Sequence, residues 1–112
     1  MNRSCKCLLP VAALLASGCA TSAAGLHRMG VEHVIEGTKS AQDFATCTAE
    51  VMQGSPMLRG GGGHWWVTRD NGYGIPIVRW DFTDKPGGGS VAELRATAIA
   101  GAAKDKVRAC AN

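Results

Sequence analysis

Several features that mark an enzyme or a cofactor protein are scarce in this chain. Its 112 residues include only three histidines, His27, His33 and His64, and no two of them share a metal-ligand spacing. The glycine-rich stretch at 87–90 lacks both the lysine ending of a phosphate-binding loop and the spacing of a dinucleotide fingerprint. The sequence therefore predicts no metal site, no cofactor and no catalytic residue.

An excess of charge of one sign is also missing from most of the chain. Two of the twelve basic residues, Arg3 and Lys6, lie near the N-terminus, which leaves ten basic against nine acidic residues downstream. The signs are interspersed, as on an ordinary solvated surface. A nucleic-acid-binding protein needs a clustered basic face, so we expect no nucleic-acid partner.

Long apolar runs are absent too. The longest, residues 8–16, is much shorter than the roughly 20 apolar residues that span a bilayer as a helix. It follows Arg3 and Lys6 without an acidic residue and precedes the small residues Ser17 and Gly18. Basic, apolar and small segments in this order are typical of a secretory signal, which we assign to residues 1–18.

The end of this signal, Leu15-Ala16-Ser17-Gly18-Cys19, resembles the lipobox of bacterial lipoproteins. The resemblance covers residues 1–19 and departs from the pattern at Ala16, where leucine is usual. It implies that the signal is cut before Cys19 and that Cys19 carries the lipid. Two acyl chains give stable membrane anchoring. The alternatives are ordinary cleavage near Gly18, which leaves a secreted protein with an unpaired thiol, or a core helix with a chance cysteine.

The residue after the lipidated cysteine carries a sorting signal in lipoproteins of the enterobacterial type. There an aspartate retains the protein at the inner membrane, whereas this chain has Ala20. The resemblance therefore implies a location at the periplasmic face of the outer membrane, with the membrane as one partner through the lipid anchor.

The five cysteines reduce to one pair once each is placed. Cys5 and Cys7 leave with the signal, and Cys19 is assigned to the lipid. Cys47 and Cys110 remain, and in an oxidising compartment we predict a disulfide between them. It would close a loop of about 64 residues and contribute about 4 kcal/mol. Two separate buried thiols are the alternative.

Periodicity predicts five elements after a tether that runs from Cys19 to residue 30. A strand at 31–36 precedes a helix at 40–53 that Ser40 caps. Strands at 64–69 and 75–82 flank Asn71-Gly72, which predicts a hairpin. A capping-box pattern at Ser90 and an alanine stripe predict a helix from 90 to about 109.

The order strand–helix–strand–strand–helix predicts an α+β fold for residues 31–112. We expect a small two-layer sandwich, in which two helices cover one face of a three-stranded sheet in the order 1-3-2, stapled by the disulfide.

The hairpin register predicts two distinct faces. Placing Asp70 opposite Ile75 puts Trp65 opposite Trp80 on the core side. The other side then carries His64 opposite Asp81 and Trp66 opposite Arg79. The simple interpretation of Trp66 is a cation–π pair with Arg79, and the functional one is an anchor for a partner or a stacking platform for a glycan.

These observations leave three functions open. We expect a non-enzymatic envelope lipoprotein whose domain engages another envelope protein. The alternative is a module that binds cell-wall glycan or peptide through His64, Trp66, Arg79 and Asp81. A more distant possibility is a small hydrolase in which Asp81 orients His64 as a general base, although no nucleophile with a local signature accompanies the pair.

Overall fold

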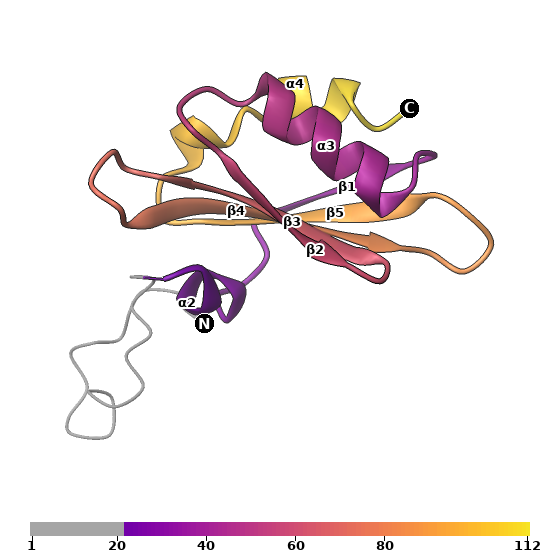
Figure 1. The fold of residues 1–112 in the computed structure, drawn as a ribbon, viewed down its shortest axis with the longest axis horizontal. Coiled ribbons are helices and arrows are strands. Elements are labelled where there is room, and N and C mark those ends of the chain that lie inside the picture. Colours follow the sequence, from indigo (N-terminus) through magenta and orange to yellow (C-terminus); the bar gives the residue numbers. More distant parts are fainter. Residues whose placement is uncertain (1–21) are drawn as a thin grey trace.

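The computed structural model describes residues 22–112, and a five-stranded antiparallel sheet forms its centre (Figure 1). Along the sheet the strands are β1 (His33–Gly37), β5 (Ser90–Ala96), β4 (Pro76–Asp84), β3 (His64–Asp70) and β2 (Met57–Gly61). Helix α3 (Ala41–Val51), the 3₁₀ helix η1 (Ile99–Ala102) and α4 (Lys104–Ala109) lie over one face, and α2 (Ala23–His27) lies against the other.

The expected three-stranded sandwich with strand order 1-3-2 is therefore wrong, because the fold is mostly β with some α. One missed strand is β2, which pairs with β3 from Met57 opposite Thr68 to Gly61 opposite His64. Gly62 and Gly63 make the turn with φ of 64° and 89°. Two positive φ values in a two-residue loop match the hairpin turn that glycine favours.

The second missed strand is β5, in the segment expected to be a long helix. Ser90, Ala92, Leu94 and Ala96 are buried and alternate with less buried residues, which is the period of a strand. The Ser90 hydroxyl donates to the carbonyl of Lys39 at 2.8 Å instead of capping a helix. Pairing with β1 and β4 on both sides overrides the helical preference of the alanines.

Other expected elements are present. Ser40 caps α3 by accepting a hydrogen bond from the amide of Asp43 at 3.1 Å, which confirms the predicted helix start. The strand expected at 31–36 appears as β1 and the hairpin as β3 and β4. The structure also pairs Cys47 with Cys110 as the predicted disulfide, with 5.7 Å between the Cα atoms. This bond attaches α3 to the residue that follows α4.

The register of the hairpin is offset by two residues from the expected one. Trp65 lies opposite Phe82 and Val67 opposite Trp80, because Asp70 pairs with Pro76 instead of Ile75 and an irregularity between Arg69 and Asp70 shifts the ladder by one further residue. An even offset keeps every side chain on its expected face. Trp80 is accordingly fully buried on the face that α3, η1 and α4 cover, which we call the helix side. There its indole Nε1 donates to the carbonyl of Ala102 at 3.0 Å, and Trp65 packs against this core.

Residues 23–27, which the sequence analysis placed in a tether, form α2 in the structure. Ser22 caps this short helix through a hydrogen bond from the amide of Gly25 at 3.0 Å. Leu26 is fully buried, so the segment is packed onto the domain. In the part of the chain from 22 to 112, every helix is too short or too polar to cross a bilayer.

Candidate functional site

The sheet face beneath α2 is organised around one buried carboxylate. Asp81 lies on the central strand β4, where alternation sends Trp80 and Phe82 to the helix side and turns Asp81 and Arg79 to the opposite side. Asp81 is 2 % exposed and Arg79 is 6 % exposed. A charge at such a position must be paired and hydrogen-bonded to be tolerated.

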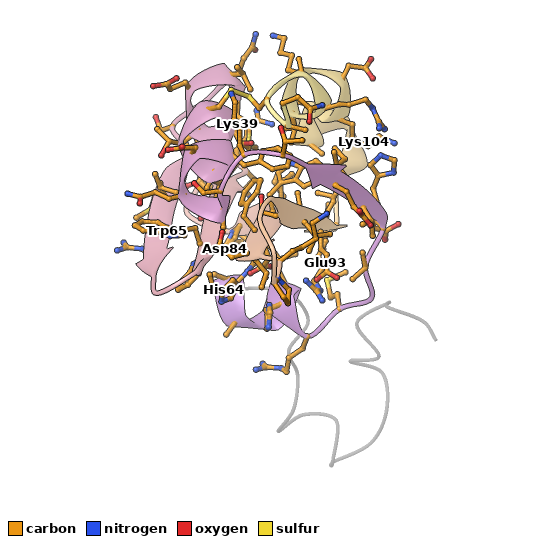
Figure 2. The ribbon with its side chains drawn as sticks, turned by 90° about the vertical axis from the view of Figure 1, so that its right-hand side faces the viewer. Lys39, His64, Trp65, Asp84, Glu93 and Lys104 are labelled. Atoms are coloured by element: carbon orange, nitrogen blue, oxygen red, sulfur yellow. A yellow bond between two sulfur atoms is a disulfide. The ribbon has the colours of Figure 1, made fainter. Side chains whose placement is uncertain are left out.

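Four side chains satisfy this carboxylate. Arg79 binds it in a bidentate way, donating from Nε to Oδ2 at 2.9 Å and from Nη2 to Oδ1 at 2.8 Å. Nε2 of His64 lies 2.8 Å from Oδ1, and Nδ1 of His27 and Nη1 of Arg95 each lie 3.4 Å from Oδ2. We call Asp81, Arg79, Arg95, His27 and His64 the Asp81 cluster. Figure 2 shows His64 on the α2 side of the sheet, away from Lys39 and Lys104.

The Asp81 cluster also holds the N-terminal segment of the described chain. Arg79 donates from Nη1 to the carbonyl of Ala23 at 3.1 Å, and Arg95 donates from Nε to the carbonyl of Met29 at 3.0 Å. His27 itself belongs to α2. The two guanidinium groups thus connect the carboxylate on β4 to backbone atoms within α2 and just after it.

All four residues of the predicted binding face come together in the structure. The expected direct pairs are wrong, because His64 lies opposite Thr83 and Trp66 opposite Asp81. The contacts nevertheless form along the diagonal, where the guanidinium carbon of Arg79 is 4.9 Å from the Trp66 ring centroid and His64 reaches Asp81. Trp66 is partly buried, and α2 lies over this side of the sheet (Figure 1).

Sequence reasoning missed two members of the cluster. The sequence predicts a tether at His27 and a helix at Arg95, whereas His27 lies in α2 and Arg95 in β5. The signal that could have found Arg95 is the strand period of residues 90–96, which places Glu93 and Arg95 on the face of Asp81. For His27 the only cue is Leu26, an apolar residue in an otherwise small and polar stretch.

Opposing effects act on the pKa of Asp81, and together they favour its charged form. Burial on its own raises the pKa of this carboxyl, but hydrogen bonds from Arg79 and His64, with the charges of Arg79 and His27, bring the pKa below its ordinary value. Asp81 is therefore an ionised acceptor at neutral pH, shared among several donors. His64 therefore shares this carboxylate with the guanidinium groups of Arg79 and Arg95.

Within residues 22–112, no group of three or more histidine, cysteine, aspartate or glutamate side chains is placed to hold a metal ion.

Comparison with models of known protein families, with curated proteins and with solved structures found no match for the chain.

Replacing the carboxylate tests the role of the Asp81 cluster in stability. We predict that Asp81→Asn lowers the free energy of unfolding at neutral pH by about 3–5 kcal/mol, because it leaves the buried guanidinium of Arg79 without its counter-ion and removes one of the two carboxylates that Arg95 contacts. A depressed carboxyl pKa contributes stability above its ordinary value of about 4, and this stability is lost as pH falls through the lower folded-state pKa. The difference from the unmodified protein should therefore shrink in acid.

Urea unfolding at a series of pH values measures this effect. Glu50→Gln, which changes an exposed carboxylate on α3, serves as the matched control and should leave both stability and its acid dependence unchanged. Equal stability of Asp81→Asn and the unmodified protein at neutral pH would show that the cluster contributes no net stability.

Proposed function

We propose that the protein is a lipid-anchored envelope protein, attached through Cys19 at the periplasmic face of the outer membrane, that acts as a non-enzymatic interaction module. The lipobox-like segment that ends at Cys19 supports the anchor. The Asp81 cluster supports a defined placement of the domain, because it fixes α2 to the sheet.

The short distance between the anchor and α2 limits how far the domain extends from the membrane. From Cys19 to Ala23, the first residue of α2, the chain spans about 14 Å at most when fully extended. Because α2 is packed onto the sheet, the α2 side of the domain faces the bilayer in this proposal. The helix side and the hairpin ends then remain accessible to other envelope proteins.

The observation that carries an interaction function is the loop between β3 and β4. Tyr73 at its tip is 89 % exposed, and Ile75 beside it is 42 % exposed. The loop is held by its own side chains: Asn71 Oδ1 accepts from the amides of Tyr73 and Ile75 at 2.7 and 3.3 Å, and Asp70 Oδ1 accepts from Gly72 at 2.9 Å. This hairpin end projects from the sheet at the left of Figure 1.

An exposed tyrosine on a preordered loop suits protein recognition. Tyrosine is enriched at interfaces and among the residues that dominate binding energy. Because side-chain hydrogen bonds already order the loop, binding a partner costs less conformational entropy. Stacking of a cell-wall glycan on Trp66 has less support, since Arg79 already lies over that ring and both residues are at least partly buried.

Replacing the anchor cysteine tests the first part of the proposal. We predict that Cys19→Ser abolishes incorporation of labelled acyl chains and leaves the protein unprocessed, because both steps need the Cys19 sulfur. The control Cys7→Ser changes a cysteine within the signal and should keep both labelling and cleavage. Acyl labelling that persists in Cys19→Ser would contradict the assignment.

Photo-crosslinking tests the second part in the bacterium that encodes the protein. We predict that a photoreactive phenylalanine analogue at Tyr73 forms one discrete protein adduct, and that Ile75→Ser in the same chain strongly reduces it. The analogue at Gln42, exposed on α3, is the matched control and should give no such adduct. An absent adduct, an equal adduct at Gln42 or an adduct with lipid alone would contradict the interaction function.

A further inference from the structure

A separate feature lies on the helix side of the sheet, away from the Asp81 cluster. The structure has a hollow of about 580 Å³ between the C-terminal end of α3, the end of β3 and the η1–α4 segment. Its polar lining comes from Gln53, Arg69, Lys104, Asp105 and Lys106. Figure 2 shows Lys104 on the helix side, across the molecule from His64.

The charges around this hollow are not balanced. Three cations line it against the single carboxylate of Asp105, and Arg69, Lys104 and Lys106 form no ion pair with any residue from 22 to 112. The guanidinium groups on the other face differ, because Arg79 and Arg95 both reach Asp81. The hollow is therefore a local excess of positive charge.

Arg69 is the member of this set that has a buried polar atom without a hydrogen-bond partner among residues 22–112. It is partly buried, and Nη1 donates to the carbonyl of Gly101 at 3.3 Å. No residue from 22 to 112 accepts a hydrogen bond from its buried Nε. A guanidinium removed from water without a counter-ion is unfavourable, and an anion that enters the hollow would relieve this cost.

The backbone beside Arg69 is also unusual. Ala103, in the wall of the hollow, has φ of 56° and is the one non-glycine residue within 22–112 in the left-handed region. It stands directly before Lys104, so its conformation sets the direction in which α4 starts. Strained backbone of this kind persists where the surroundings enforce it, and such positions concentrate at binding sites.

We propose that this hollow binds the phosphate group of a small phosphorylated molecule. Three cations against one carboxylate leave a net positive charge that complements a phosphate dianion. Arginine and lysine are the side chains that commonly bind phosphate groups in proteins. The volume lies within the range of roughly 300–1,000 Å³ that small-molecule sites occupy. The non-phosphate part of the molecule contacts the apolar walls at Val51 and Ala103.

Titration calorimetry on the full-length protein in detergent tests the proposal. The probes are inorganic phosphate, glycerol phosphate and a short-chain phosphatidic acid, with glycerol as the neutral control. Binding of the soluble phosphates indicates a free metabolite, whereas binding of phosphatidic acid alone indicates a lipid headgroup; either result supports the site. Glycerol should not bind.

Charge-removing variants locate the binding. Arg69→Gln should weaken phosphate affinity by about tenfold or more, because it removes a charge-assisted hydrogen bond. Lys104→Gln combined with Lys106→Gln should weaken it similarly, and both side chains are exposed, so the fold is retained. Arg59→Gln, an exposed change on β2, is the matched control and should bind as the unmodified protein does.

Two results would overturn the proposal. One is the absence of binding by any phosphate probe at millimolar concentration. The other is unchanged affinity in both the Arg69 and the double lysine variants, which would place any bound phosphate elsewhere on the molecule.

Discussion

A buried carboxylate on the central strand is the constraint on which the α2 side of the structure depends. Asp81 is almost fully removed from water and needs donors from several elements to stay charged. They come from β3 (His64), from β4 itself (Arg79), from β5 (Arg95) and from α2 (His27). The same guanidinium groups then bind backbone carbonyls of the N-terminal segment, so satisfying one charge also holds α2 in place.

Different kinds of interaction consequently stabilise the two faces of the sheet. On the helix side, Phe44 of α3 packs on Phe82 at 4.9 Å between ring centroids, and a disulfide joins Cys47 to Cys110. On the other side, α2 buries Leu26, and the Asp81 cluster supplies hydrogen bonds and ion pairs to the N-terminal segment. Acid should therefore loosen the α2 side first, whereas reduction of the disulfide should act on the helix side.

This division matters for the proposed anchoring. If the lipid is attached at Cys19, the mechanical connection between membrane and domain runs through α2 and the Asp81 cluster. A free tether would let the domain tumble near the bilayer, whereas a docked helix gives it a preferred orientation. The face predicted as a binding surface thus has an occupant in the described structure, which is the chain's own N-terminal segment.

The sequence predicted those parts of the fold in which one period dominates. These parts are helix α3, the β3–β4 hairpin, the two faces of that hairpin and the cysteine pair. The Asp81–His64 and Arg79–Trp66 contacts were found despite a wrong register, because an even offset preserves the faces and long side chains reach along the diagonal.

The remaining parts follow from tertiary context that a single sequence does not display. Alanine is compatible with both the apolar stripe of a helix and the buried face of a strand. Pairing with β1 and β4 on its two sides therefore determines that residues 90–96 form the strand β5. Strand β2 contains Gly60 and Gly61, which weaken any strand signal, and pairing with β3 defines it. The five-residue helix α2 is too short to show a helical period, and it contacts the sheet through the Asp81 cluster.

Amide hydrogen exchange tests most directly whether Asp81 holds α2 on the domain. In the unmodified protein, the amides of α2 that bond within the helix should exchange far more slowly than those of an unstructured chain. In Asp81→Asn, the account predicts that α2 loses this protection while α3, fixed by its apolar core and the disulfide, keeps its own. Unchanged protection of α2 in Asp81→Asn would contradict the account, because another interaction would then hold the helix.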